Sequence, residues 1–284
     1  MKNILVPIDF TDASLSGLQS AVNWTQQYGG QISLVCFVLP HSDIQDLHPK
    51  DAILGISDSR HFKDLAEAGN HVLEDLESLM KAHVPKHLRG STYSVEDSIT
   101  ELWEMVMHQI NPDLIICGTS QERNFIEIFT GTEIENIIRN SDVPVLTVSH
   151  NDGLKIKNVL LATDVGNTLP HKLINICKLL QANGAKIHLV NFINSHLITK
   201  EEIIIKLDKM AQELGFTNYA IHVKSHDGIA DEILKMRTQL NADIILMKTY
   251  EKSLFWQIFQ SSLAEEIVRN AGVPAMIEKV TGNQ

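Results

Sequence analysis

The sequence has 284 residues, 44% of them hydrophobic and 21% charged, and this composition excludes disordered, collagen-like and low-complexity chains. The formal net charge of −11 and the pI near 5.6 make nucleic acid and anionic membrane surfaces poor partners. The length is typical of about two domains.

The amino terminus carries no recognisable targeting segment. Its apolar run reaches Asp9 too soon to form a signal peptide, and no apolar run approaches the ~18 residues of a membrane span. The three cysteines, an odd number without CxxC spacing, predict buried reduced thiols rather than a disulfide scaffold. We therefore expect a cytoplasmic protein.

Short apolar runs alternate with amphipathic stretches along the first half. The apolar runs predict β-strands at residues 4–8, 32–38, 93–95, 114–117 and 143–148. Apolar residues at helical spacing predict helices at 13–27, 62–80 and 133–140, and Gly29 with Gly30 ends the first of them. Strands this continuously apolar are buried on both faces, which is typical of a parallel sheet.

The second half repeats this pattern. Residues 2–9 align with 157–164 at an offset of 155 residues, which also places Gly29 on Gly184 and Phe37 on Phe192. Residues 111–116 align with 241–246 at an offset of 130 residues. The smaller second offset predicts an insertion of about 25 residues in the first half, and residues 40–60 are rich in loop formers.

We therefore predict two tandem domains, at residues 1–150 and 151–284. Each is expected to be an α/β domain with a doubly wound, five-stranded parallel sheet and right-handed crossovers. Ligands of such sheets bind beyond the carboxyl ends of the strands, near the point where the strand order reverses. In the first half those positions hold Asp9, Phe37, Val38, Gly118 and Thr119, and Pro7, two residues before Asp9, is counted with them as a candidate site residue.

A second candidate feature lies at the predicted helix 133–140. Gly131 and Thr132 would present unpaired backbone N–H groups at its amino terminus, where the helix dipole favours phosphate. Thr132 and Glu135 also form a capping box, which explains the threonine without a ligand, and both explanations stay open. Two substitutions indicate a disabled or repurposed site in the second half: Lys248 in place of Gly118 and Ser261 in place of Gly131.

Both halves resemble universal stress protein domains over nearly the whole chain. Nucleotide-binding members of that family carry the pattern G-x2-G-x9-G-(S/T) after strand four. This sequence has Gly118, Gln121, Gly131 and Thr132 at the four positions. It departs from the pattern at Gln121, where the family has its second glycine.

The resemblance implies the adenine-nucleotide α-hydrolase-like fold and a first half that binds ATP or ADP, with Mg²⁺. Asp9 would contact the adenosine portion, and the backbone of Gly118, Gly131 and Thr132 would hold phosphates. The resemblance also implies an antiparallel pairing of strand 143–148, here with residues 273–277, which makes the chain a pseudo-dimer and protects an exposed edge. A second copy of the chain or other universal stress proteins would be its protein partners.

Three functions stay open. The first is a nucleotide-binding sensing or regulatory module with at most slow hydrolysis. The second is a nucleotide-free stress-response protein acting through its surface or dimer edge, which Gln121 favours. The third, an enzyme of the wider fold group, is disfavoured because the sequence has no GxSxG, Walker A or GxGxxG motif in the required context and nominates no catalytic residue.

The histidines and a group of aromatic residues could each be taken for ligand-binding residues, but the spacing of neither group supports a binding site. The histidines have no zinc-ligand pattern, and Pro85 interrupts the pair His83 and His87, so we predict no metal site. Aromatic residues recur at matched positions of the two halves, which favours packing over a ligand platform: Phe125, Phe129, Phe255, Trp256 and Phe259.

Overall fold

The computed structural model describes residues 2–38, 61–96, 107–118, 143–148, 155–163, 165, 169–193, 198–225, 229–250 and 271–280. The first half contains β1 (Asn3–Pro7), α1 (Asp12–Tyr28), β2 (Gln31–Val38), α2 (His61–His83), the 3₁₀-helix η3 (Lys86–Leu88), β3 (Arg89–Glu96), β4 (Leu114–Gly118) and β5 (Val145–Val148). The second half contains β6 (Asn158–Ala162), α5 (His171–Ala182), β7 (Lys186–Ile193), α6 (Lys200–Glu213), β8 (Tyr219–Ser225), α7 (Ile229–Leu240), β9 (Ile244–Tyr250) and β10 (Ala275–Val280).

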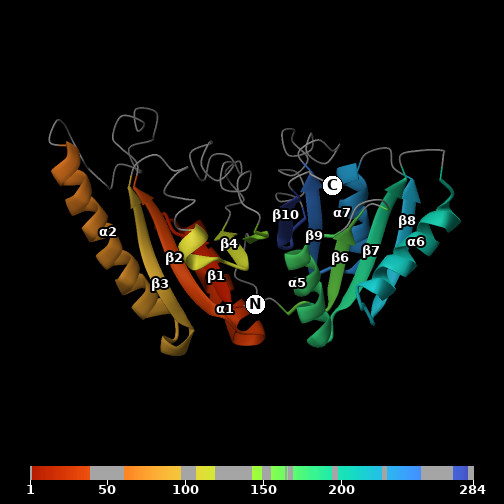
Figure 1. The fold of residues 1–284 in the computed structure, drawn as a ribbon, viewed down its shortest axis with the longest axis horizontal. Helices are drawn as coiled ribbons and strands as arrows, with labels where there is room; N and C mark the ends of the chain where they lie inside the picture. The colour runs from red at the N-terminus through yellow and green to blue at the C-terminus, as the bar shows by residue number, and fades with distance from the viewer. Residues whose placement is uncertain are drawn as a thin grey trace.

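The strands form one ten-stranded sheet in the order β3-β2-β1-β4-β5-β10-β9-β6-β7-β8 (Figure 1). Within each half all neighbouring strands are parallel, and the second half repeats the order of the first in mirror sequence. Each half therefore has five parallel strands with the reversal of strand order at its first strand. This confirms the predicted tandem of doubly wound α/β units.

The two halves join through β5 and β10, which pair antiparallel. Thr147 lies opposite Ala275, Leu146 opposite Met276 and Val145 opposite Ile277. The Thr147 hydroxyl also donates to the Ala275 carbonyl oxygen at 3.1 Å. The chain thus covers its own apolar edge strand, as the predicted intrachain pseudo-dimer requires.

Helix α1 begins and ends where the sequence predicts, within one residue. The Thr11 hydroxyl accepts a hydrogen bond from the Ser14 backbone N–H and caps the amino terminus. Gly29, with φ of 80°, ends the helix, a conformation that residues with a Cβ rarely adopt. Helix α2 extends the predicted 62–80 by a few residues, to His83. The insertion at 40–60 and the helix at 133–140 lie outside the described residues.

Strand β3 is longer than the predicted 93–95. It runs from Arg89 to Glu96 and contains polar residues, so its pattern gives only a weak strand signal. It lies at one end of the sheet and pairs only with β2 among the described strands. A strand with a single neighbouring strand needs fewer apolar residues than a central strand. This explains why the apolar pattern predicts only residues 93–95 as a strand.

The repeated Asp113 and Asp243 fix the amino ends of the strands. Asp113 Oδ2 accepts hydrogen bonds from the backbone N–H groups of Lys2 and Asn3, at 2.5 and 3.1 Å. Asp243 Oδ2 does the same for Lys157 and Asn158, at 2.8 Å each. The repeated Lys-Asn and Asn-x-Asp segments are therefore explained by strand anchoring, with no ligand needed.

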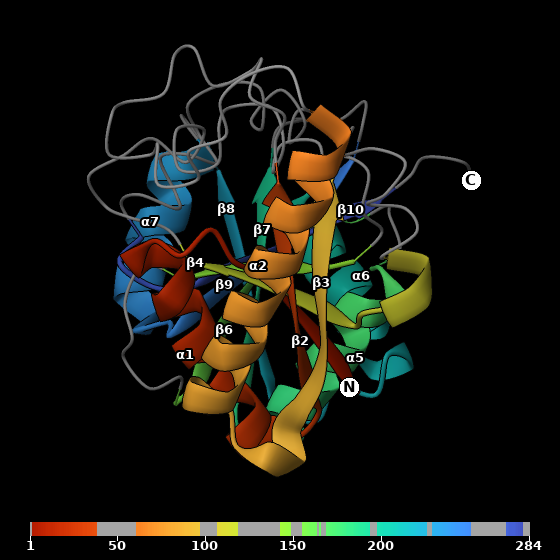
Figure 2. The same cartoon turned by 90° about the vertical axis from the view of Figure 1, so that its left-hand side faces the viewer.

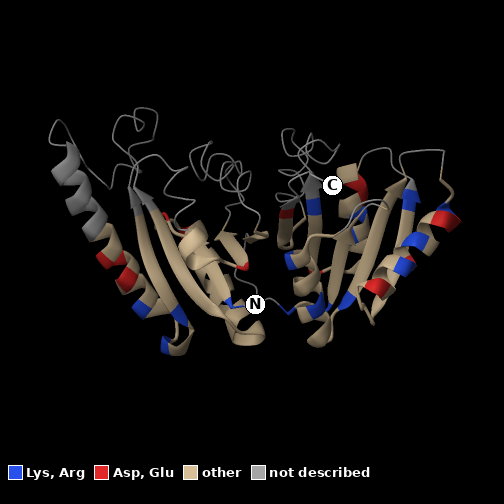
Figure 3. Cartoon of the chain, viewed as in Figure 1, with Lys and Arg blue, Asp and Glu red and all other residues tan. Residues whose placement is uncertain are grey.

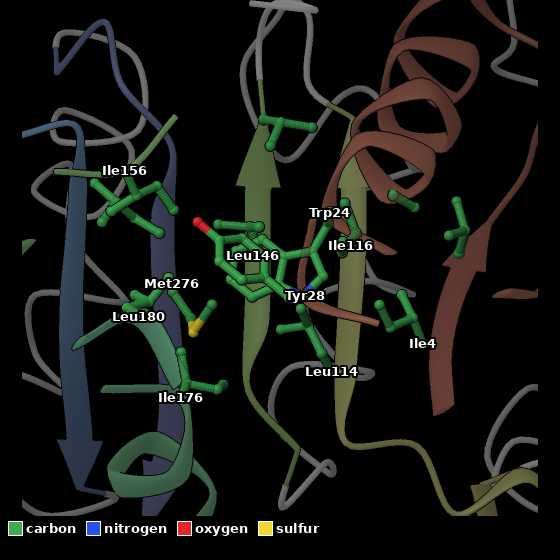
Figure 4. Close-up of a cluster of buried hydrophobic side chains, with 14 of the residues drawn as sticks. Ile4, Trp24, Tyr28, Leu114, Ile116, Leu146, Ile156, Ile176, Leu180 and Met276 are labelled. Atoms are coloured by element: carbon green, nitrogen blue, oxygen red, sulfur yellow. The ribbon is translucent and has the colours of Figure 1, made fainter. Parts of the chain in front are cut away.

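A continuous apolar core crosses the join between the halves. Trp24, Leu146, Leu180 and Met276 are all fully buried in it, and Figure 4 shows side chains of both halves facing one another there. The three cysteines, Cys36, Cys117 and Cys177, are buried, and burial raises their pKa values to about 12. These thiols stay protonated, in agreement with the prediction of buried reduced cysteines. In the described part of the chain, no helix is long and apolar enough to cross a membrane.

Candidate functional site

The strand order of the first half reverses at β1, which lies between β2 and β4. Ile4 of β1 pairs with Leu114 of β4, and Leu5 with Ile115, so the two parallel strands end at the same edge of the sheet. The outer strands of both halves point toward the upper side of the molecule in Figure 1. Asp9 follows β1 and Gly118 ends β4, and the topology therefore brings these two predicted site residues to one edge.

The Asp9 carboxylate is held in place by the turn into α1. Its Oδ1 accepts hydrogen bonds from the Thr11 backbone N–H at 3.0 Å and from the Thr11 hydroxyl at 2.6 Å. Phe10 between them has φ of 61°, a conformation uncommon for a residue with a side chain. Thr11 thus both orients Asp9 and caps α1, so the strand end, the carboxylate and the helix form one rigid unit.

Gly118 is a glycine because α1 packs directly against it. A Cβ at Gly118 would lie 1.6 Å from the Ala13 carbonyl oxygen, and a Cβ at Gly17 would lie 2.6 Å from the Gly118 nitrogen. Both distances are far below any permitted contact. The sequence pattern predicts close approach of phosphate at this glycine, whereas the packing of α1 already requires a glycine there.

Pro7, Phe37 and Val38 belong to strands that end beside Asp9. Pro7 is the last residue of β1, is buried and pairs with Val35 of β2. Phe37 and Val38 are the last two residues of β2. Burial, with a smaller contribution from the Asp9 carboxylate, raises the pKa of Cys36 on the same strand. Asp9 therefore lies close enough to the end of β2 for its charge to be felt there.

The remaining predicted site residues lie outside the described residues: Thr119, Gln121, Gly131 and Thr132. The same holds for Asp164 and Ser261 of the second half, and for the aromatic group at 125–129 and 255–259. Their assignments stay predictions. Of the histidines considered, His83 ends α2 and His87 belongs to η3, so Pro85 does separate them into two elements. Among the described residues no three His, Cys, Asp or Glu side chains form a group able to hold a metal ion.

The second half has a charged pair where the first has Gly118 and Val148. Lys248 of β9 and Glu278 of β10 lie in register on neighbouring parallel strands, and each is only 4% exposed. Figure 3 shows charge on both strands in a sheet whose other strand interiors are mostly uncharged. Burying two charges is costly unless each finds opposite charge or hydrogen bonds, so this pair is a specific feature of the second half.

Glu278 also caps helix α5. Its Oε2 accepts a hydrogen bond from the Leu173 backbone N–H at 2.8 Å. The residue before the helix is Pro170, which has no side-chain acceptor, so Glu278 supplies the missing partner from another strand. Sequence reasoning did not single out Glu278. The available signal was an acidic residue directly after the apolar run Ala275–Ile277 of a predicted buried strand.

Helix α5 is shorter than α1 at its amino terminus. At the offset of 155 residues, its first residue His171 corresponds to Ser16, whereas α1 begins at Asp12. Ala13, whose carbonyl oxygen excludes a side chain at Gly118, corresponds at this offset to position 168, which lies outside the described residues.

Comparisons with known proteins point to one family. The model described as the universal stress protein family matches residues 1–149. A curated universal stress protein of Methanocaldococcus jannaschii is 34% identical over 88 residues, covering 30% of this chain and 50% of the relative. The chain therefore spans about half the length of the curated relative it matches.

Solved structures share the fold across almost the whole chain. A universal stress protein from Archaeoglobus fulgidus matches with a TM-score of 0.67 and 19% identity, covering 98% of this chain and 96% of that one. A functionally unknown protein of Pseudomonas aeruginosa PAO1 matches with a TM-score of 0.60 and 15% identity, covering 98% and 92%. Identities this low support the fold alone.

Proposed function

This chain belongs to the universal stress protein family, and from that membership we propose that its first half binds ATP or ADP as a sensing or regulatory ligand. The proposed domain is residues 1–150, with residues 151–284 forming the second domain. The observation that carries the proposal is the arrangement of Asp9 and Gly118 at the carboxyl ends of the neighbouring strands β1 and β4. This is the position at which doubly wound sheets bind ligands.

Asp9 supplies the proposed contact to adenosine. Thr11 fixes one carboxylate oxygen with two hydrogen bonds, which orients the carboxylate before any ligand arrives. A preoriented carboxylate is a good acceptor for ribose hydroxyl groups, because little side-chain freedom is lost on binding. Pro7, Phe37 and Val38 would border the base and ribose at the ends of β1 and β2.

The phosphates are assigned to backbone N–H groups of the segment that follows β4. Gly118 begins that segment, and Thr119, Gln121, Gly131 and Thr132 complete the proposed cradle. Mg²⁺ would be held largely by the phosphates and water, as is usual for this ion.

The second half is proposed not to bind nucleotide. The buried side chains of Lys248 and Glu278 occupy positions where the first half has a glycine and a valine. Glu278 is also committed to the amino terminus of α5. A carboxylate fixed at this location repels phosphate, so the substitutions act against a second nucleotide.

A nucleotide-free interaction protein is the competing function. One observation favours it: helix packing alone explains the glycine at position 118. The join between β5 and β10 also covers the edge that a second copy would use, so a partner would have to engage another surface.

Substitution of Asp9 tests the proposal. In the nucleotide-stripped protein, we expect Asp9→Ala to weaken Mg-ATP binding by at least about tenfold, because a charge-assisted hydrogen bond is lost. Asp75→Ala, which removes an exposed carboxylate from α2, is the matched control and should leave the affinity unchanged. Thermal unfolding of both variants checks that they are folded. Equal affinities of Asp9→Ala and wild type would contradict the assignment.

A further inference from the structure

A cavity of about 320 Å³ lies at the join between the two halves. Among the described residues, helix α5 provides most of its lining and Asp113, just before β4, provides the rest. The lining residues are Asp113, Lys172, Asn175, Ile176, Lys178 and Leu179. A volume of this size is within the range of small-molecule sites, which often lie between domains.

The internal repeat explains why the cavity exists. At the offset of 155 residues, Leu179 corresponds to Trp24 of α1, which is fully buried. Tyr28, one turn later, packs against Trp24 with ring centroids 4.7 Å apart. Its hydroxyl points toward Ile156 of the other half in Figure 4, and its pKa is raised by burial and by the carboxylate of Asp243. Asp243 is the counterpart of Asp113, so aromatic side chains occupy the related position on the other side of the pseudo-dimer.

The lining combines an apolar base with two cationic side chains. Ile176 is buried and Leu179 is half-buried, whereas Lys178 is exposed at the rim. Lys172 Nζ donates to the Pro112 carbonyl oxygen at 3.1 Å, which holds its ammonium group at the join. Asp113 is the one acidic residue among the described lining residues, and its Oδ2 already accepts the two backbone N–H groups of Lys2 and Asn3.

From this arrangement we propose that the cavity binds a small organic anion: an aromatic or aliphatic body with one carboxylate or similar group. The apolar body packs on Ile176 and Leu179, where the other half has Trp24. The anionic group is held by Lys172 and Lys178, whose two charges exceed the single charge of Asp113 among the described lining residues.

This site is separate from the proposed nucleotide site. Asp113 precedes β4, whereas Asp9 follows β1, and the two strands are parallel. The cavity and Asp9 therefore lie at opposite ends of the strands. Either proposal can fail without affecting the other.

Calorimetric titration of the full chain with 2-naphthoate tests the proposal, with 2-naphthalenemethanol as the neutral probe of similar shape. We expect one naphthoate site per chain, and about fivefold or weaker binding of the alcohol because it lacks the charge-assisted contacts. Lys178→Gln should weaken naphthoate binding by a similar factor. Lys206→Gln, which removes an exposed lysine from α6, is the matched control and should not change it.

Leu179→Trp places in α5 the residue that α1 carries and should abolish naphthoate binding while Mg-ATP binding is retained. If this variant does not fold, Lys178→Gln and the neutral probe still decide the question, because Lys178 is exposed and its replacement does not disturb the core. Absence of saturable binding at millimolar naphthoate would overturn the proposal. Equal binding of acid and alcohol, or equal affinity in Lys178→Gln and wild type, would overturn it as well.

Discussion

Lys248 on β9 and Glu278 on β10 lie in register with both side chains buried, at the two positions where the first half has Gly118 and Val148. The two halves therefore share the same strand pairing. At this point, however, a glycine and a valine in the fourth and fifth strands of the first half are replaced by two charged residues in the second half. In the first half α1 packs directly against Gly118, and in the second half two buried charged side chains stand at the corresponding positions.

Removing one member of this pair is expected to destabilise the protein. Lys248→Met leaves the Glu278 carboxylate buried without its neighbouring cation, and we expect the free energy of unfolding to fall by about 3 kcal/mol. Glu278→Gln keeps an acceptor for the Leu173 N–H but removes the charge. Urea unfolding of both single variants and of the double variant measures their coupling. We expect the free energy of unfolding to fall in the double variant by at least about 1 kcal/mol less than the sum of the decreases in the two single variants. Strictly additive losses would show that the two charges do not interact.

Gly118→Ala is expected to be destabilising through α1. The added Cβ would overlap the Ala13 carbonyl oxygen, so the helix must move away from β4. We expect a loss of about 3 kcal/mol in the free energy of unfolding, measured by urea denaturation. Gly215→Ala is the control: its φ of 74° disfavours alanine, but open space surrounds it, and it should cost only about 1 kcal/mol. Similar losses in the two variants would contradict the packing argument.

Much of the fold can be predicted from the sequence, because the sequence signals for its elements are local or occur in both halves. The apolar run of β4 and the glycine that ends α1 each act within a few residues, and the family resemblance together with the repeat predicts the partner of β5. The role of Glu278 cannot be predicted from the sequence, because its hydrogen bond to Leu173 joins residues 105 positions apart. The reason for a glycine at position 118 cannot be predicted from the sequence either. Helix packing and phosphate binding both require a glycine, and only the approach of α1 in the folded structure distinguishes them. The cavity likewise depends on how α5 meets the loop before β4.

The histidine pair of β7 and β8 predicts a stability that depends on pH. His188 Nδ1 lies 3.1 Å from His222 Nε2, and burial, together with the positive charge of His222 and Lys186, lowers the pKa of His188 to about 4. The unfolded chain therefore binds a proton near pH 6.5 that the folded protein does not accept until about pH 4. Stability contributed by neutral His188 is present above pH 6.5 and is lost as the pH falls from 6.5 to 4.

Comparison of His188→Gln with wild type isolates this effect. As the pH falls across this range, we expect the free energy of unfolding of wild type to decrease by on the order of 1 kcal/mol more than that of the variant. This is less than the full pKa shift implies, because solvent reaches the half-exposed His222 and screens the interaction. Chemical denaturation at a series of pH values provides the measurement. His87→Gln, at an exposed position in η3, should follow the wild-type curve. Parallel curves for His188→Gln and wild type would refute the prediction.

The Asp113 anchor predicts a structural role at the amino edge. Asp113→Asn keeps one acceptor oxygen but weakens two hydrogen bonds to backbone N–H groups, and we expect a loss of about 1 kcal/mol in the free energy of unfolding. Asp243→Asn should cause a similar loss, because it makes the same two contacts in the second half. Neither change should alter Mg-ATP affinity, since both residues lie at the edge opposite Asp9. A large effect on nucleotide affinity would place the ligand elsewhere than proposed.

The stoichiometry of Mg-ATP binding is the most direct test of the proposed function. Calorimetric titration of the purified, nucleotide-stripped chain should saturate at one nucleotide per chain. The first half has Gly118 and Val148 at its site, whereas the second half has the charged residues Lys248 and Glu278 at the corresponding positions. Two nucleotides per chain would contradict the assignment of the second half. No saturable binding by the folded protein would contradict nucleotide binding itself and favour the interaction function.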